Sequence, residues 1–369
     1  MRTVEVGDRP SRSMFSGAAV ARMDSIHDQS SEHDPWRSWL RQFLCIFVAA
    51  LAATYLFVIV IDPFSTGRLA LTQHIDRNSG NQFLSKVGLV RDPQFDGAIF
   101  GSSIAGALDP SHIGQLTDRN MVQLSFYGVK PKNTLIVARA YDRHHRGSAT
   151  LQIFILDFMW CDQHFLSQSI FPDWLYEDSP LGEYLSRMFN PEAFSLAVRR
   201  IGMWLGLAEP QLPADGFAPI LPRHFDEQVA RRALLATKPE MDGLAPAAPF
   251  PAIDELASHL TVLDSRSSVL LVSLPIFVNA LPPDGSAAAL RIAACKERIS
   301  SVAAQRPKTA YLDLQLDNAM ARDVDGYSDW VHVRGSVARL VEAEIGRAAI
   351  RSSLPADDHS VVELRDSRP

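Results

Sequence analysis

The sequence predicts an α/β protein, in which helices cover both faces of a parallel sheet of about five strands and one transmembrane helix precedes this domain. Two observations predict this class. Short apolar runs alternate with helical patterns over most of the chain after residue 92, and one uncharged apolar run lies near the N-terminus. A chain of 369 residues with 47% hydrophobic residues is also long and apolar enough to bury a sizeable core.

The apolar runs are rich in β-branched and aromatic residues, and they predict strands at residues 95–103, 120–126, 150–158, 268–274 and 309–315. Such nearly continuous runs are typical of strands that are buried on both faces, as in a parallel sheet. Helical patterns separate them at residues 133–143, 252–264, 287–304 and after Gly335. This alternation indicates a three-layer, doubly wound, flavodoxin-like fold. Residues 159–250 interrupt it, and we expect them to form a mostly helical insertion.

The uncharged run extends from Phe43 to Ile61. As a helix it would be about 28 Å long, close to the thickness of a hydrocarbon core. Trp36 and Trp39 precede it, where aromatic rings favour the membrane interface. The alternatives are a buried core helix and a cleaved signal peptide. The length of the run and the long polar segment before it favour an uncleaved anchor, which would place residues 43–61 in a lipid bilayer.

The charges that flank the run do not decide its orientation. Arg37 and Arg41 lie on its N-terminal side, and Arg68 and Arg77 lie on its C-terminal side. The composition predicts five parts: a disordered tail at 1–42, the transmembrane helix at 43–61, a juxtamembrane connection at 62–92, the α/β domain at 93–350 and a second disordered tail at 351–369.

Net charge and cysteine usage narrow the functional class. The net charge of −6 gives no general attraction to nucleic acid, so we expect no nucleic-acid partner. Cys45 lies in the apolar run, whereas Cys161 and Cys295 either form a disulfide in an extracytoplasmic domain or remain two separate buried thiols. The sequence contains no Gly-rich phosphate loop, nicotinamide fingerprint or metal-ligand motif, so we expect neither a cofactor nor a metal.

Ligands of open parallel sheets bind beyond the carboxyl ends of the strands. The first predicted strand ends in Gly101-Ser102-Ser103, and a helix is expected to open directly afterwards. A serine at such a turn exposes its hydroxyl at the sheet edge, beside the positive end of the following helix. The two serines are therefore candidates for a nucleophile, or they cap the helix.

A serine nucleophile needs a base, and the base needs an orienting acid. Asp329-Trp330-Val331-His332 follows the last predicted strand. The same D-x-x-H spacing also begins at Asp24, Asp109 and Asp142, so spacing alone is weak evidence. Position separates the copies, because only Asp329 and His332 follow the carboxyl end of a strand.

Acyl transfer also needs hydrogen-bond donors for the oxyanion. The backbone N–H groups of Ser103 and Gly128 are candidates, although Gly128 is also consistent with an ordinary turn glycine. Asp157 follows the third predicted strand. With Ser102 it either faces the cleft or has a structural role as a cap or partner.

The Gly101-Ser102-Ser103 block, Gly128 and Asp329-x-x-His332 together resemble the SGNH (GDSL-like) hydrolase superfamily over residues 93–347. The chain looks most similar to the membrane-anchored branch, which includes the teichoic-acid D-alanylation and alginate O-acetylation proteins. The resemblance implies that Ser103 is the nucleophile, His332 the general base and Asp329 its orienting acid. It also implies a periplasmic domain, anchored in the cytoplasmic membrane, that acts on a cell-envelope polysaccharide or glycolipid, with a membrane-bound acyl donor protein as a further candidate partner.

The chain departs from the family pattern at two points. Ser102 stands where the family usually has aspartate, and LDFMWCD follows the third strand instead of a G-x-N-D block. The asparagine that usually completes the oxyanion hole is therefore unassigned, and losing such a donor typically costs about 10²–10³ in rate.

Three functions stay open at this point. The first is a serine O-acyltransferase or esterase that works through an acyl-serine. The second is a non-catalytic scaffold of an envelope polysaccharide-modifying complex. The third is a lipase-like esterase, whose apolar groove would be lined by insertion residues that fit the core of the insertion better: Phe165, Phe171, Trp174 and Leu175.

Overall fold

The computed structural model describes residues 35–69, 77, 79–167, 169–219, 225–238 and 249–352. The chain divides into two compact units, Met1–Leu51 and Ala52–Pro369. Most of the two predicted disordered tails, at 1–34 and 353–369, lies outside the described residues.

Helix α1 extends from Pro35 to Ile61, so it begins before the uncharged run. Within the part of the chain that the structure describes, it is the one helix long and apolar enough to cross a membrane. The prediction of a disordered tail up to residue 42 is wrong for residues 35–42. Proline is favourable in a first helical turn, and Trp36, Trp39 and Phe43 stack along one side of the helix with ring centroids 5.0 and 5.5 Å apart.

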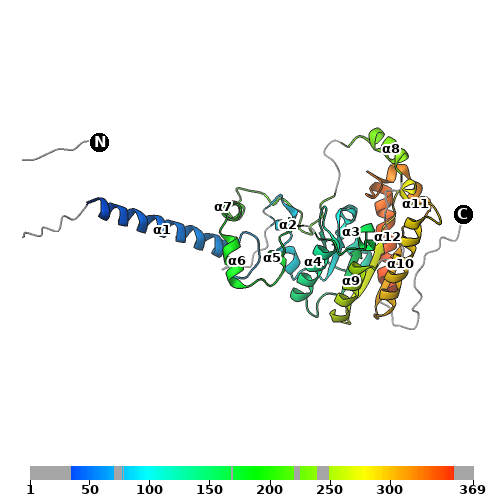
Figure 1. Ribbon diagram of the computed structural model, residues 1–369, viewed down its shortest axis with the longest axis horizontal. Coiled ribbons are helices and arrows are strands. Elements are labelled where there is room, and N and C mark those ends of the chain that lie inside the picture. Colours follow the sequence, from blue (N-terminus) through cyan, green and yellow to red (C-terminus); the bar gives the residue numbers. More distant parts are fainter. Residues whose placement is uncertain are drawn as a thin grey trace, which may run out of the picture. The chain divides into compact units, whose positions relative to one another are not determined.

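The α/β class predicted for the large unit is confirmed (Figure 1). Its five strands are β1 (Gly97–Gly101), β2 (Met121–Ser125), β3 (Leu151–Ile155), β4 (Ser268–Ser273) and β5 (Thr309–Asp313). They are all parallel and lie in the order β2-β1-β3-β4-β5. Every residue of β1 to β4 is buried, which explains why these strands are apolar on both faces.

Helices cover both faces of the sheet. One apolar cluster joins Phe100 and Phe154 to α4 (Pro131–His144), α9 (Pro251–Val262) and α10 (Ala287–Ala304). The other joins Ile99 and Ile153, the neighbouring strand residues, to α3 (Pro110–Thr117) and α12 (Gly335–Ser352). Successive strand residues point to opposite faces, so the two clusters are the two sides of an α/β/α sandwich.

Where the insertion after β3 is described, it consists of short helices joined by loops. It contains η3 (Phe158–Cys161), α5 (Asp173–Tyr176), α6 (Leu181–Met188), α7 (Pro191–Trp204) and α8 (Glu227–Ala236). The remaining short elements are α2 (Gln82–Ser85), η1 (Leu89–Arg91), η2 (Ser103–Ala107), η4 (Val278–Ala280), α11 (Ala319–Arg322) and η5 (Val324–Gly326).

The two central cysteines form a disulfide. Cys161 of η3 is bonded to Cys295 of α10, with their Cα atoms 5.6 Å apart, so the sequence alternative of two separate thiols is excluded. Cys45 is free and exposed. The disulfide fixes the start of the insertion to a helix that covers the sheet, close to the edge where β3 ends.

Candidate functional site

The order of the strands creates a topological switch point between β1 and β3, where ligands bind in open α/β sheets. β1 ends at Gly101, Ser102 follows in extended backbone, and Ser103 begins the 3₁₀ helix η2. A Cβ atom at Gly101 would lie 3.0 Å from Cβ of Ile155 and 3.1 Å from Cβ of Ala105. Glycine therefore lets η2 turn closely over the sheet, and it leaves the Ser103 hydroxyl at the edge.

The Asp329–His332 segment is a closed loop before α12. Tyr327 and Val333 form an antiparallel bridge across its base, and the N–H of Ser328 donates to the carbonyl oxygen of His332 at 2.9 Å. The carbonyl oxygen of Trp330 accepts a 2.8 Å hydrogen bond from the N–H of Phe277, which lies beyond β4. These contacts fix the loop against the carboxyl edge of the sheet.

The structure brings the three predicted catalytic residues together in one hydrogen-bonded chain. The Nδ1 atom of His332 is 2.6 Å from Oδ2 of Asp329, and its Nε2 atom is 2.9 Å from Oγ of Ser103. Oδ1 of Asp329 accepts the N–H groups of Val331 and His332, both at 3.0 Å. The carboxylate thus holds the imidazole in the orientation in which a neutral ring can accept the serine proton.

The charge of Asp329 is consistent with this role. Partial burial raises the pKa of the Asp329 carboxyl, but the hydrogen bonds and charge of His332, with the backbone N–H groups of Val331 and His332, together lower the pKa below its ordinary value. The carboxylate is therefore ionised at neutral pH and accepts the Nδ1–H of His332. The side chain of Asp329 is 50% exposed, whereas that of His332 is 19% exposed.

The D-x-x-H copies that begin at Asp109 and Asp142 do not form such a chain. His112 contacts the buried Glu342 through Nδ1 at 2.5 Å, and Nε2 of His145 contacts the backbone carbonyl oxygen of Val90 at 3.1 Å. The copy at residues 24–27 lies outside the described residues. The signal in the sequence that distinguished Asp329 and His332 from the other D-x-x-H copies was their position after the carboxyl end of a strand.

Ser102 and Asp157 form a second pair at the same edge. The Ser102 hydroxyl donates to Oδ2 of Asp157 at 2.5 Å, and the N–H of Met159 donates to Oδ1 at 3.0 Å. Both side chains are buried, and burial raises the pKa of Asp157 to about 6, although the hydrogen bonds from Ser102 and Met159 partly offset it. The pair connects the turn after β1 to the turn after β3, so it supports the backbone that carries Ser103.

The two predicted oxyanion donors lie on adjacent loops. β1 and β2 pair up to Gly101 and Ser125, and the N–H of Phe126 donates to the carbonyl oxygen of Gly101 at 3.1 Å. The loop that carries Gly128 therefore begins beside the turn that carries Ser103. Gly128 has a φ of +70°, which favours glycine. Neither its N–H nor that of Ser103 donates to a backbone carbonyl among the described residues. Their role as oxyanion donors stays a prediction.

Sequence reasoning missed three residues beside this edge. The rings of Phe158 and Trp330 are 5.8 Å apart, and they join the loop after β3 to the Asp329–His332 loop. Lys130 precedes α4, its Nζ lies 3.2 Å from Sδ of Met159, and its charge lowers the pKa of Asp157. A lysine just before a helix carries no distinctive sequence signal.

The four residues considered for the groove of a lipase-like esterase contribute to the core of the insertion, although Phe171 and Trp174 also line a hollow with charged side chains. Phe171 and Leu175 belong to the buried core, and Phe165 and Trp174 pack against that core. This burial agrees with the alternative interpretation of the sequence, in which these side chains form the core of the insertion.

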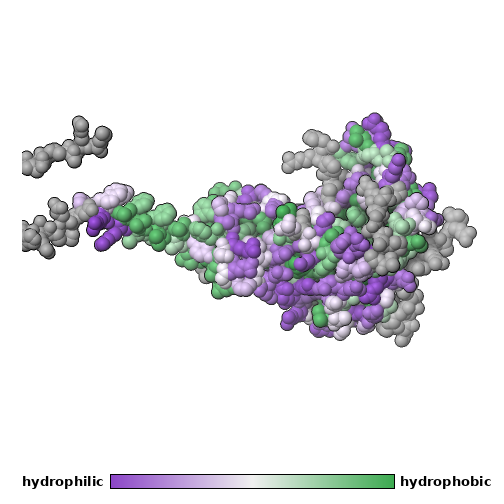
Figure 2. All heavy atoms as spheres, in the orientation of Figure 1, coloured by the Kyte–Doolittle hydropathy of each residue, from purple (hydrophilic) through white to green (hydrophobic). Residues whose placement is uncertain are grey.

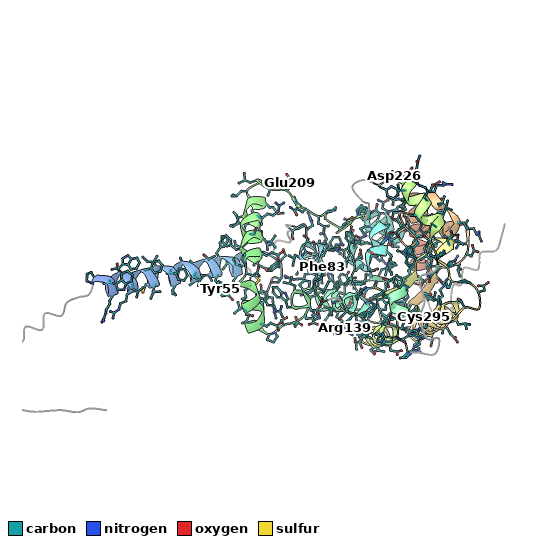
Figure 3. The ribbon with its side chains drawn as sticks, turned by 45° about the horizontal axis from the view of Figure 1, so that its top comes forward. Tyr55, Phe83, Arg139, Glu209, Asp226 and Cys295 are labelled. Atoms are coloured by element: carbon teal, nitrogen blue, oxygen red, sulfur yellow. A yellow bond between two sulfur atoms is a disulfide. The ribbon has the colours of Figure 1, made fainter. Side chains whose placement is uncertain are left out.

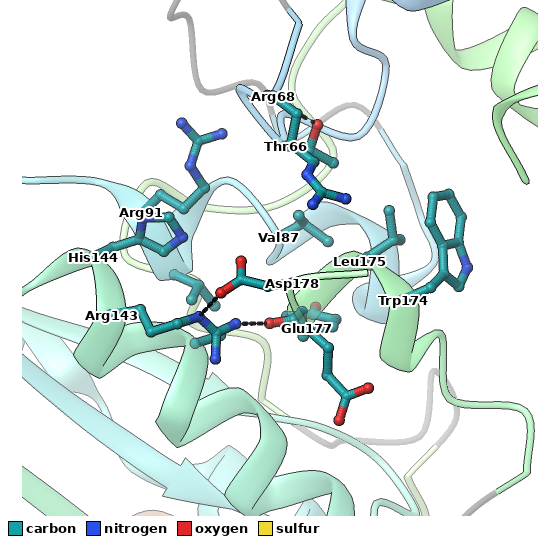
Figure 4. Close-up of a pocket in the computed structure, with 13 residues that line it drawn as sticks. Thr66, Arg68, Val87, Arg91, Arg143, His144, Trp174, Leu175, Glu177 and Asp178 are labelled. Carbon is teal, nitrogen blue, oxygen red and sulfur yellow. Dashed lines mark hydrogen bonds and ion pairs between the residues drawn. The ribbon is translucent and has the colours of Figure 1, made fainter. Parts of the chain in front are cut away.

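A cavity of about 60 Å³ lies where the juxtamembrane connection meets α4 and α5 (Figure 4). Three arginines line it, but each has a partner: Arg68 donates to the carbonyl oxygen of Ser179 at 2.6 Å, Arg91 to that of Ser65 at 2.9 Å, and Arg143 pairs with Asp178 at 3.2 Å. The cavity therefore belongs to a joint that connects residues 62–69 to the insertion. Among the described residues, no group of three or more His, Cys, Asp or Glu side chains could hold a metal ion.

The fold and the site together define a parallel α/β domain with a Ser–His–Asp chain at its topological switch point. No protein-family model matches the sequence, and no curated protein matches it significantly.

Proposed function

We propose that this protein is a membrane-anchored, SGNH-like serine acyl-transfer enzyme. The observation that carries the proposal is the hydrogen-bonded chain from Ser103 through His332 to Asp329, which joins side chains 229 residues apart in the sequence. Structural capping of η2 would not require the distant histidine, and the copies at Asp109 and Asp142, the other two that the structure describes, lack this arrangement.

The proposed reaction has two steps. Nε2 of His332 accepts the proton of the Ser103 hydroxyl while Oγ attacks an ester or thioester carbonyl, and the N–H groups of Ser103 and Gly128 stabilise the oxyanion. His332 then gives the proton to the leaving group, which leaves an acyl-serine. In the second step a sugar hydroxyl or water loses its proton to His332, attacks the acyl-serine and regenerates Ser103.

Two features support an extracytoplasmic location and an envelope substrate. The Cys161–Cys295 disulfide is expected where the compartment is oxidising, as in the periplasm. Helix α1 would hold the domain at the cytoplasmic membrane, where an acyl donor can be membrane-borne and the acceptor can be a polysaccharide or a glycolipid. Arg37 and Arg41 would then face the cytoplasm.

The test uses the full chain in lipid nanodiscs with p-nitrophenyl acetate as acyl donor. Ser103→Ala should abolish turnover, whereas the matched control Ser111→Ala, a serine on the outer helix α3, should not change it. Acetylation of added oligosaccharide, together with faster release of p-nitrophenol, would identify a transferase. Turnover in the Ser103 variant equal to that of the wild type would refute the proposal, and polysaccharide binding without any turnover would favour the scaffold.

A further inference from the structure

Helices α6 and α7 present an apolar surface that the core of the domain does not cover (Figure 2). α7 buries Ala193, Leu196 and Ala197, while Phe194 and Val198 on another side are 44% and 51% exposed. Further apolar side chains with at least 39% exposure lie at the start of α6, between α6 and α7, at the last residue of α7 and just after it: Leu181, Phe189, Trp204, Leu205 and Leu207. We call these seven residues the α6–α7 face.

This face is continuous with the end of the membrane helix. The ring of Phe189 contacts that of Tyr55 with centroids 5.4 Å apart, and the ring of Phe194 contacts that of Phe57 at 6.0 Å. The Tyr55 hydroxyl also donates to the carbonyl oxygen of Leu185 at 2.5 Å. Figure 3 shows Tyr55 at the end of α1, beside the helices of the insertion.

The position of this junction near the end of α1 indicates its depth. Asp62 is the first charged residue after the uncharged run, and the helix is continuous to Ile61. At 1.5 Å per residue, Tyr55 lies about 9 Å and Phe57 about 6 Å before Ile61 along the axis. With the end of the uncharged run at the boundary of the hydrocarbon core, both aromatic residues lie inside that core. The side chains that touch them share that depth.

The junction is folded rather than a free linker. The guanidinium group of the buried Arg200 on α7 donates to the carbonyl oxygen of Asp62, the residue after α1. The Asp62 carboxylate accepts the N–H groups of Thr66 at 3.0 Å and Gly67 at 2.6 Å. α6 and α7 are therefore fixed to the end of α1.

We propose that the α6–α7 face lies in the surface of the same bilayer that α1 crosses, with its apolar side chains among the lipid acyl chains near the headgroups. The inference depends on the membrane anchoring in the proposed function. Helices that lie in the plane of a membrane place apolar and tryptophan side chains at this level. The α6–α7 face then holds the domain at one depth and in one orientation, so that the catalytic edge keeps a constant height above lipid-borne substrates.

The test measures contact of single labels with lipid in the full chain. The Val198→Cys variant is made on a Cys45→Ala background, and its new cysteine is labelled with the environment-sensitive fluorophore NBD. The labelled protein is placed in nanodiscs whose phospholipids bear a doxyl quencher near the headgroup. Val262→Cys on α9 is the matched control, because it is also an exposed valine on a helix, with 83% exposure. Leu205→Cys repeats the measurement on the same face. The unchanged Cys45, labelled in the wild-type chain, reports whether α1 itself is in the bilayer.

We expect quenching at positions 198 and 205 to be at least about twice that at position 262, with blue-shifted emission. Quenching at Cys45 with none above the control at either test position would overturn the inference and leave the anchor intact. Labels at 198 and 205 that are shielded from aqueous iodide but not quenched by lipid would also overturn it, because a second copy or another protein would then cover the face. Absence of quenching at Cys45 would refute the anchor and, with it, this inference.

Discussion

Replacing Asp329 by asparagine tests whether the hydrogen-bonded chain activates Ser103. The amide oxygen of the introduced asparagine can still accept the N–H groups of Val331 and His332, which now lie 3.0 Å from the carboxylate. The loop should therefore keep its shape. The amide N–H₂, however, would face Nδ1 of His332 and favour the tautomer that carries its proton on Nε2. That tautomer donates to Ser103 and cannot accept its proton.

The size of the effect follows from the exposure of the acid. Removing the charge of the acid in a Ser–His–Asp site, with its geometry retained, costs about 10⁴ in rate where the acid is buried. The Asp329 side chain is 50% exposed, so water can partly compensate for the loss of its charge. We expect kcat/KM to fall by about 10³, which corresponds to about 4 kcal/mol of transition-state stabilisation.

The assay is hydrolysis of p-nitrophenyl acetate, corrected for the rate of the Ser103→Ala protein. Asp162→Asn is the matched control, because Oδ1 of Asp162 lies 3.1 Å from Nδ1 of the exposed His164 and also accepts its N–H at 2.8 Å. The control should keep the wild-type rate. A rate for Asp329→Asn within about tenfold of the wild type would refute the assignment of Asp329 as the orienting acid.

Three further predictions concern the support of the site. Burial raises the pKa of Asp157 to about 6, so its contribution to stability is present below about pH 4 and is lost as the pH rises through 6. The free energy of unfolding of Asp157→Asn, measured with urea, should therefore rise relative to that of the wild type by up to about 3 kcal/mol between pH 4 and pH 8. An equal difference between the two proteins at both pH values would contradict the burial of this carboxyl. Replacing Cys161 and Cys295 by alanine opens a loop with a sequence separation of 134, and it should lower the free energy of unfolding by up to about 5 kcal/mol. Thermal unfolding with and without reductant measures this loss, and a wild-type melting temperature that does not respond to reductant would oppose it. Gly101→Ala should cost about 1–3 kcal/mol and reduce turnover, because the added Cβ would meet Ile155 at 3.0 Å and displace the turn of Ser103; unchanged stability and rate would show that the turn yields easily.

The sheet could be predicted from the sequence because its strands are buried on both faces. Each of the five apolar runs contains a strand, and a few residues at the ends of the runs lie outside it. Helix α3 was not predicted, since its eight residues bury only Pro110, Ile113 and Gly114 and leave no long apolar pattern. The start of α1 was missed for a related reason: residues 35–42 are polar enough to indicate a tail, although the helix begins at Pro35 and includes them.

The candidate catalytic residues could be proposed because the carboxyl ends of parallel strands lie at one edge. The sequence could not show that Ser102 turns to the buried Asp157 while Ser103 turns to His332, because adjacent serines differ only in backbone direction. Nor could it show the pairing of Cys161 with Cys295, which depends on how the insertion returns to α10. The position of α6 and α7 against α1 depends on aromatic contacts between distant segments, which have no local pattern.

The most direct measurement of the central claim is the site of reaction with a fluorophosphonate, which forms an adduct only with an activated serine. Intact mass spectrometry of the full chain in nanodiscs should show one adduct, and peptide mapping should place it on Ser103. The adduct should be absent from Ser103→Ala and should remain on Ser111→Ala. An unlabelled wild-type protein, or an adduct that persists in Ser103→Ala, would contradict the assignment of Ser103 as a nucleophile activated by His332 and Asp329.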